Sequence, residues 1–587
     1  MLKLLTKLKL KEIILMVINA FFIVVQVWLD LRLPEYMSNI TTLVQTPGSS
    51  MNDILAQGYG MLSCIGASLV TSIIIVLLSS FIGAGFAQTL REEMFDKVYS
   101  FGMEEVKRFS ISSLITRTTN DITHVQRLVA MGLQIAIRAP IMAVWAISKI
   151  VNKSYMLSGL TGIAVVISGL VMFIAMLIVV PKFKLMQKLT DRLNSVSREG
   201  LLGIRVVRAY NAERYQENKF EEVNEDITRI GKFTGKAMSL LWPIVDLIHY
   251  GLTIGIYVVG AILINNAVLD MKLELFSNII VFSNYSSQVL AAFMMLSMIV
   301  IMYPRVSVSS NRILEVLNTK PTMKQGTVDQ HSDVKGLLEV KNISFKYPDA
   351  NKYILKNISF TANQGETIAI LGSTGCGKST LLNLIHRFYD VESGEILIDG
   401  INVKDYTRET LNSKFGYVPQ KAILLSGNVS ENVAYGTSGG DKPQHDDIVK
   451  AVQIAQAERF VLEMDDGYQS EVARGGNNLS GGQKQRLQIA RAIARQPEFY
   501  IFDDSFSALD YKTDATLRSE LKKHSRNITN LVVSQRISTI RYADKILVLD
   551  DGHVVGEGRH NDLLDTCPLY RAMAEAQLRK EELYNET

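Results

Sequence analysis

Long apolar runs dominate the first half of the chain. Residues 54–90 contain no charged side chain, and a helix that crosses a bilayer needs about 20 apolar residues. Further apolar runs lie at about 13–33, 128–151, 156–180, 240–266 and 275–303. The buried core of a water-soluble domain accounts for one such run but not for six. The pattern therefore predicts six helices that cross a lipid bilayer.

The second half alternates short apolar runs with polar segments. Thr367–Leu371 and Phe499–Phe502 are short and rich in β-branched or aromatic residues, which is typical of buried strands. The run Leu381–Ile385 opens a segment with helical periodicity. Residues 319–336 are polar and lack periodicity, so we interpret them as a linker. The predicted organisation is a membrane domain over 1–318, the linker over 319–336, an α/β domain over 337–575 and a charged tail over 576–587.

Charge indicates how the membrane half is oriented. The chain of 587 residues has 62 Lys and Arg against 58 Asp and Glu, for a net charge of +4. Basic residues gather before the first run and in segments 91–127 and 182–236, whereas segments 34–53 and 267–273 carry few. Under the positive-inside rule, both termini then face the cytoplasm in a multi-pass protein of the cell membrane, with no cleavable signal peptide. Because the excess basic charge flanks the membrane, we expect no nucleic-acid partner.

A glycine-rich motif directly follows the strand Thr367–Leu371. It fits G-x-x-x-x-G-K-[ST], and its position between a strand and a helix is the context of a phosphate-binding loop. The glycines let backbone N–H groups surround phosphate oxygens at a helix N-terminus. Lys378 is expected to reach the β- and γ-phosphates, and the Ser379 hydroxyl to bind Mg²⁺. The candidate nucleotide-binding residues of this loop are Gly372, Ser373, Thr374, Gly375, Cys376, Gly377, Lys378, Ser379 and Thr380.

A second motif, Leu479–Gln483 with the sequence LSGGQ, precedes a strand-like run that ends at Asp503. Together with the phosphate loop, these motifs resemble the ATP-binding cassette (ABC) family. The resemblance implies ATP and Mg²⁺ as cofactors, with Asp503 and Gln420 contacting Mg²⁺ and Tyr347 stacking on adenine. It also assigns four signature-loop residues to nucleotide binding, namely Ser480, Gly481, Gly482 and Gln483.

The family resemblance extends to the membrane half. Residues 113–121 (SLITRTTND) and 203–210 (GIRVVRAY) resemble exporter sequences near the two cytoplasmic coupling helices. Six apolar runs ahead of one cassette are the layout of an exporter half-transporter, whereas importers usually keep the two parts on separate chains. The implied fold is an all-α, six-helix transmembrane domain with long cytoplasmic helical extensions. It is fused to an α/β P-loop nucleotide-binding domain that has an α-helical subdomain.

Two positions depart from the family pattern. Asp504 stands where fully active cassettes carry the glutamate that polarises the attacking water, and Gln535 replaces the switch-loop histidine. The shorter carboxylate holds a water in line less well, and a glutamine carries no positive charge. Asp504, Gln535 and Gln420 are therefore the catalytic candidates of a slow, degenerate ATP site.

The signature loop, in contrast, keeps its consensus, and in the family it acts on the nucleotide held by the partner cassette. The chain thus resembles the degenerate-site subunit of heterodimeric bacterial multidrug-type exporters. The expected partner is a homologous half-transporter that carries the consensus Glu and His. The expected cargo is a small amphipathic or apolar compound such as a drug, lipid or peptide.

Polar residues inside the apolar runs are costly in lipid and are candidates for function. Asp246 and His249 lie about one helical turn apart in the fifth run. They either line a substrate cavity or a proton-linked site, or they lie at cytoplasmic depth or pair across helices to hold the bundle. Asp30 and Arg138 present the same two alternatives. Aromatic and methionine side chains of the last two runs would suit an adaptable apolar pocket or fill an ordinary helix-bundle core, namely Trp242, Tyr250, Tyr257, Phe293, Met294 and Met295.

Two other functions remain compatible with this sequence. One is a siderophore importer built on the exporter fold. Its ATPase activity would be stimulated specifically by a metal complex. The other is a membrane protein that ATP binding gates without turnover, which would show no ATPase activity even with its partner.

Overall fold

The computed structural model describes residues 2–46, 48–151, 153–267, 269–329, 334–436, 443–580 and 582–584. It divides into two compact units, which we call the membrane unit (Met1–Tyr99 with Ile111–Thr319) and the nucleotide unit (Ser100–Ser110 with Lys320–Thr587). The division after Thr319 falls at the start of the predicted linker, of which residues 330–333 lie outside the described part. Unlike the predicted domains, the nucleotide unit also takes in the short segment 100–110.

The described part of the membrane unit is built of helices, with two π-helical turns, η1 and η2. Six helical stretches are long and apolar enough to cross a membrane, which confirms the six predicted spans. Helices suit this environment because they pair all backbone N–H and C=O groups within one segment. The elements are α1 (Leu2–Leu5), α2 (Leu10–Gln45), α3 (Met51–Tyr99), α5 (Ile111–Thr116), η1 (Arg117–Asp121), α6 (Ile122–Arg127), η2 (Leu128–Gly132), α7 (Leu133–Val151), α8 (Tyr155–Leu202), α9 (Ile204–Ala209), α10 (Glu213–Asn265) and α11 (Leu269–Asn318).

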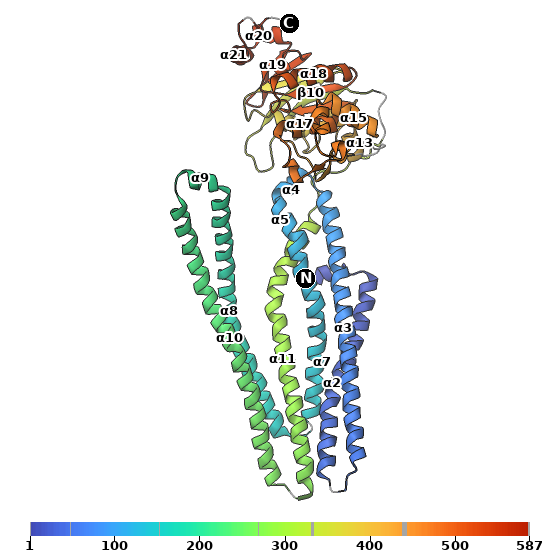
Figure 1. Cartoon of the computed structure of the whole chain (residues 1–587), viewed down its shortest axis with the longest axis vertical. Helices are drawn as coiled ribbons and strands as arrows, with labels where there is room; N and C mark the ends of the chain where they lie inside the picture. Colours follow the sequence, from blue (N-terminus) through green and yellow to red (C-terminus); the bar gives the residue numbers. More distant parts are fainter. Residues whose placement is uncertain are drawn as a thin grey trace. The chain divides into compact units, whose positions relative to one another are not determined.

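The long helices extend beyond the predicted apolar runs. Figure 1 shows α8 and α10 running side by side, with the short helix α9 joining their far ends. Helix α9 lies in the segment 203–210, where the sequence predicts the second coupling helix. The first predicted coupling helix corresponds to α4 (Met103–Phe109), which belongs to the nucleotide unit.

Ion pairs join helices within the membrane unit. The Arg138 guanidinium lies 2.9 Å from the Asp30 carboxylate, which also accepts a hydrogen bond from Ser68. Lys149 and Glu35 form a second pair at 2.7 Å. Of the two alternatives for Asp30 and Arg138, the structure therefore supports pairing between helices.

The nucleotide unit contains two larger sheets and a two-stranded ribbon. The main sheet has the order β12-β11-β3-β10-β9-β6, in which all strands but β12 run parallel. The second sheet, β2-β1-β4-β5, is antiparallel. The strands are β1 (Leu338–Phe345), β2 (Leu355–Ala362), β3 (Thr367–Gly372), β4 (Ser393–Ile398), β5 (Ile401–Asn402), β6 (Phe415–Val418), β7 (Gly427–Asn428), β8 (Glu471–Val472), β9 (Phe499–Asp503), β10 (Thr529–Val533), β11 (Lys545–Asp550) and β12 (His553–Gly558).

Helices connect and cover the strands of the main sheet, and this confirms the predicted α/β fold. Parallel strands need such crossovers, which bring the loops after β3, β6 and β9 to one edge of the sheet. The α-helices of this unit are α4, α12 (Lys378–Ile385), α13 (Arg408–Ser413), α14 (Val429–Val433), α15 (His445–Ile454), α16 (Glu458–Leu462), α17 (Gly481–Ala494), α18 (Tyr511–His524), α19 (Ile537–Ile540), α20 (His560–Thr566) and α21 (Pro568–Gln577).

Candidate functional site

The predicted phosphate loop connects β3 to α12 at the carboxyl end of the main sheet. The strand places Gly372 at its last position, and the helix begins at Lys378. Gly375 and Gly377 have φ values of +88° and +105°, a region that favours glycine. The loop therefore takes its shape from glycines at the required positions and leads its backbone into a helix N-terminus, where anions bind.

Lys378 folds back across this loop. Its ammonium group donates to the carbonyl oxygens of Gly372 at 2.8 Å and Ser373 at 2.7 Å, and lies 3.7 Å from the Cys376 sulfur. The residue is only 8% exposed. A buried ammonium that is held over the phosphate loop has the position needed to meet phosphate oxygens.

The candidate Mg²⁺ ligands Ser379 and Asp503 lie together. The Ser379 hydroxyl donates to the Asp503 carboxylate at 3.1 Å, because β3 and β9 both flank β10. Burial raises the pKa of Asp503, and the charge of Asp504 adds to this effect. A buried carboxylate beside a hydroxyl is an oxygen donor set of the kind that Mg²⁺ prefers. These two residues fit the ion, which would neutralise phosphate charge when bound.

Asp504 follows β9 and adopts a left-handed backbone conformation with φ of +47°. Burial raises the pKa of its carboxyl, whereas the positive charge of Arg536 and hydrogen bonding with Ser507 and Gln420 oppose that rise. The structure thus brings Asp504 and Gln420, both predicted from the sequence, into one polar cluster. Gln420 itself is exposed.

The switch loop carries Gln535, which is exposed. Its backbone is held by Gln577, the last residue of α21. The Gln577 amide donates to the Gln535 carbonyl at 2.9 Å and accepts from the Ile537 N–H at 2.9 Å. Arg536 donates to the Ser507 carbonyl at 3.0 Å. Sequence reasoning missed Gln577 because no motif marks a side chain that acts from a distant helix.

Tyr347, the predicted adenine-stacking residue, lies beside the phosphate loop. Its hydroxyl is 3.2 Å from the Thr380 hydroxyl, and its ring packs edge-on against Phe345 and Tyr389. The Lys107 ammonium of α4 lies 4.5 Å from the centre of the Tyr347 ring. This contact between Lys107 and the ring of Tyr347 was not predicted from the sequence.

The signature loop forms a separate group at the N-terminus of α17. Ser480 caps this helix, and the Ser480 N–H donates to the Gln483 side-chain oxygen Oε1 at 2.8 Å. Ser480 and Gly481 are exposed, and Gly482 is half-buried. The side chain of Gln483 is therefore used in the cap, while the helix N-terminus and the Ser480 hydroxyl present hydrogen-bonding groups that suit an anion.

The membrane unit contains an apolar cavity of about 600 Å³ between α8, α10 and α11. Six methionines contribute to its wall, and such side chains adapt to differently shaped apolar ligands. Trp242, Met294 and Met295, which the sequence marks as pocket candidates, line it, whereas Phe293, Tyr250 and Tyr257 are not among its lining residues. The methionines are Met172, Met176, Met238, Met294, Met295 and Met298.

Asp246 and His249 are not among the lining residues of this cavity. Asp246 is exposed and His249 is half-buried, with its ring 5.5 Å from that of Tyr250. Helical spacing nevertheless places them one and two turns beyond Trp242 on the same side of α10. The pair thus continues the stripe of α10 that lines the cavity.

A multi-helix membrane domain joined to a phosphate-loop unit with a separate signature loop defines an ATP-dependent membrane transporter. Comparison with known families agrees with this class. The family model of the ABC transporter transmembrane region matches residues 16–304, and the ABC transporter family model matches residues 355–507. The chain belongs to the ABC transporter family.

Relatives and a solved structure share this architecture. An uncharacterized ABC transporter ATP-binding protein of Mycobacterium tuberculosis is 37% identical over 549 residues, covering 92% of this chain and 93% of that protein. The protein YfiB of Bacillus subtilis is 34% identical over 519 residues, covering 86% and 87%. A bacterial Atm1-family ABC exporter with ATP bound has the same fold, with a TM-score of 0.80 at 22% identity over 96% of this chain and 98% of that chain.

Proposed function

We propose that this chain is the slow-site subunit of an ATP-driven heterodimeric exporter. The observation that carries the proposal is the contrast between Asp504 with Gln535 and the consensus signature loop at Ser480–Gly482. A shorter carboxylate and an uncharged switch-loop residue weaken the alignment and charge stabilisation on which phosphoryl transfer depends. The signature loop, in contrast, keeps the LSGGQ consensus.

In this account, the residues of the chain divide between two ATP sites. Lys378, Ser379 and Asp503 bind ATP and its Mg²⁺ at the slow site. Ser480 and the N-terminus of α17 contact the γ-phosphate that the partner's site transfers. The partner is a homologous half-transporter with the consensus glutamate and histidine, and both chains have cytoplasmic termini.

The division of roles predicts an unusual order of mutational effects in the paired transporter. Lys378→Ala weakens ATP binding at the slow site but leaves the partner's site able to turn over. Ser480→Ala removes a donor from the γ-phosphate under transfer, and such preorganised donors are worth about 10²–10³ in rate. Steady-state ATPase of the purified pair, mutated in this chain only, should therefore fall further for Ser480→Ala. Equal or reversed losses would falsify the assignment of fast and slow sites.

We further propose that the methionine-lined cavity accepts the apolar part of an amphipathic substrate, with Asp246 close to its polar group. The support is the cavity's apolar wall and the position of Asp246 on the same stripe of α10 as Trp242. Trp242 offers a fluorescent reporter once Trp28 and Trp145 are replaced by phenylalanine.

The substrate proposal is tested by titrating that single-tryptophan chain with tetraphenylphosphonium, an apolar cation, and with a neutral analogue of similar size. We expect saturable quenching by both compounds, and Asp246→Asn should weaken only the binding of the cation. Quenching that fails to saturate contradicts the pocket. Equal effects of Asp246→Asn on both compounds contradict the role of Asp246.

A further inference from the structure

The chain passes between its two units at three places, namely after Tyr99, after Ser110 and after Thr319. The last two of these crossings are joined by side chains. At the first of them the chain returns to the membrane unit at Ile111, and at the second it leaves the membrane unit after Thr319. The first connection continues directly into α5 and η1, and the second is the end of α11. A movement of the nucleotide unit therefore acts on the membrane unit in part through these two stretches of chain, and we call them the connectors.

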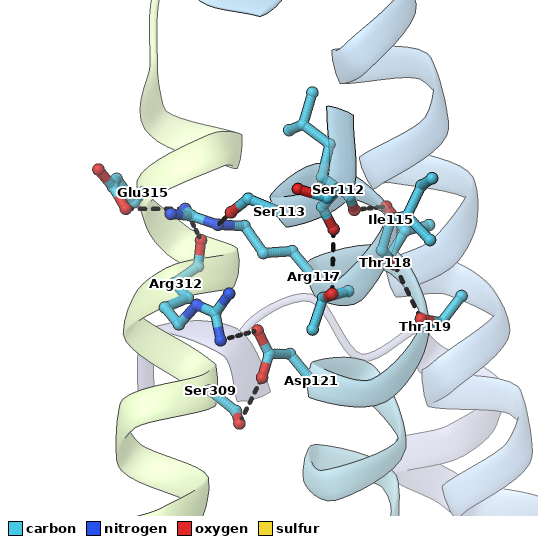
Figure 2. Close-up of polar contacts among 12 residues, drawn as sticks. Ser112, Ser113, Ile115, Arg117, Thr118, Thr119, Asp121, Ser309, Arg312 and Glu315 are labelled. Atoms are coloured by element: carbon cyan, nitrogen blue, oxygen red, sulfur yellow. Dashed lines mark hydrogen bonds and ion pairs between the residues drawn. The ribbon is translucent and has the colours of Figure 1, made fainter. Parts of the chain in front are cut away.

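A polar network joins the two connectors, and Figure 2 shows its geometry. Arg117 donates from Nη1 to the Glu315 carboxylate at 2.7 Å and to the Arg312 carbonyl at 2.8 Å. Arg312 lies 3.3 Å from the Asp121 carboxylate, which also accepts from the Ser309 hydroxyl at 2.8 Å. We call this network of Arg117, Asp121, Ser309, Arg312 and Glu315 the connector clasp.

The clasp is too specific to be an incidental surface pair. Asp121 is only 4% exposed, and Arg117 is also buried, so neither charge is freely solvated. Each buried charge has an opposite charge on α11, and each also has a hydrogen bond to a neutral group of that helix. A planar guanidinium that bonds in several directions fixes orientation as well as distance. The η1 turn between the two residues is π-helical, a feature frequent at functional sites.

A second contact joins the same two stretches of chain within the nucleotide unit. Glu105 of α4, six residues before the first connector, accepts hydrogen bonds from the backbone N–H of Thr322 at 2.8 Å and of Gly102 at 2.9 Å. Glu105 is buried, and Thr322 lies three residues after the second connector. The two connections are thus fastened to each other both before and after the chain changes units.

The two stretches of chain that the clasp joins also continue into helices of the packed core of the membrane unit. The first connector leads into α7 and the second is α11, and these two helices share a buried core that includes Met142, Ala146, Phe282 and Tyr285. Because this core is close-packed, a displacement of either connector acts on both helices.

We propose that Arg117 and Asp121 are positioning residues for transport, which make the two connectors move as one when the nucleotide unit responds to ATP. Without the clasp, the connectors can move separately, and nucleotide binding no longer repositions α7 and α11 together. This role is independent of the substrate and of which ATP site turns over.

The test uses the full chain in lipid nanodiscs, and its readout is hydrogen–deuterium exchange with and without a non-hydrolysable ATP analogue. In the unmodified chain, we expect nucleotide binding to change exchange in both units. Glu315→Ala, at a side chain that is 47% exposed, and Asp121→Asn should keep nucleotide-induced protection around the phosphate loop. They should reduce the response of α7 and α11 at least about fivefold, a usual size for coupling between sites.

Charge reversal separates coupling from simple loss of stability. Arg117→Glu should abolish the response of α7 and α11, and the double variant Arg117→Glu/Glu315→Arg should recover part of it. Lys219→Ala is the matched control, because it breaks a 2.9 Å ion pair with Glu199 between α10 and α8 that involves neither connector. A full response in Glu315→Ala and Asp121→Asn overturns the proposal, as does an equal loss in Lys219→Ala. No recovery in the double variant overturns the role of the Arg117–Glu315 pair.

Discussion

The Asp503 carboxyl group lies beside the phosphate loop, and the residue is only 6% exposed. Burial raises the pKa of its carboxyl above the ordinary value of 3.8. The folded protein therefore holds this proton more tightly than the unfolded chain does. Stability contributed by Asp503 falls as pH rises from about 4 through the raised pKa, so its charge destabilises the nucleotide-free protein at neutral pH.

We predict that Asp503→Asn stabilises the nucleotide-free protein and removes its response to Mg²⁺. A gain of about 1 kcal/mol corresponds to a rise of about 2–4 °C in the unfolding midpoint of a unit of this size. The measurement is calorimetry of the nucleotide unit's transition in the full chain, with ATP and with or without Mg²⁺. Asp551→Asn is the control, because the Asp551 side chain is 96% exposed. A lower midpoint, or a Mg²⁺-dependent shift that survives, contradicts the role of Asp503.

His386 is a buried histidine that belongs to no predicted site. Its ring lies 4.5–5.1 Å from the rings of Phe388, Phe415 and Tyr417, and neither ring nitrogen has a hydrogen-bond partner among the described residues. Burial lowers its pKa to about 3, helped by the charge of Arg495. Below pH 6.5 the histidine therefore binds a proton in the unfolded chain but stays neutral in the folded protein. The free energy of unfolding consequently falls as the pH falls.

We predict that His386→Leu reduces the acid sensitivity of the nucleotide unit. Between pH 6.5 and 5, the unmodified protein should lose about 2 kcal/mol through this residue. The midpoint measured at pH 7 and pH 5 should differ less in the variant, whereas the exposed His524→Gln should show the unmodified difference. Identical pH dependence in all three proteins would show that His386 is protonated without cost.

At the scale of single elements, helix α21 is hydrogen-bonded to the switch loop through Gln577. Gln577→Ala removes the acceptor of the Ile537 N–H and the donor to the Gln535 carbonyl. We predict that amide exchange in the switch loop then accelerates about tenfold, since a hydrogen bond contributes about 0.5–1.5 kcal/mol. Gln364→Ala, a change of the same type at an exposed position of this unit, should leave the switch loop unchanged. Unaltered exchange in Gln577→Ala would mean that other contacts hold the loop.

The elements that sequence reasoning predicts correctly are those with a strong local signal. The six spans follow from apolar length, and β3, the phosphate loop and α12 follow from a strand, glycines and a helix in fixed order. Contacts between distant segments carry no such signal. Gln577 lies 42 residues from Gln535, and Arg117 lies 198 residues from Glu315. Both contacts depend on packing, which a single sequence does not encode locally.

At the scale of the whole molecule, the sequence suggests domains in simple succession, whereas the chain crosses between its units more often. The segment Ser100–Ser110 belongs to the nucleotide unit although it interrupts the membrane unit in sequence. Its helix α4 carries Glu105 to the linker residue Thr322 and Lys107 to the ring of Tyr347. Within the nucleotide unit, α4 therefore contacts both the linker and Tyr347, which lies beside the phosphate loop.

The central claim is that Asp504 and Gln535 make the ATP site of this chain slow. The most direct test is steady-state ATPase of the chain purified alone in lipid, compared with the variant Asp504→Glu/Gln535→His. The account predicts weak hydrolysis by the unmodified chain and a rate at least about tenfold higher for the double variant, since water alignment and charge stabilisation supply most of the catalysis of phosphoryl transfer. Brisk hydrolysis by the unmodified chain alone, or no gain in the double variant, would contradict it.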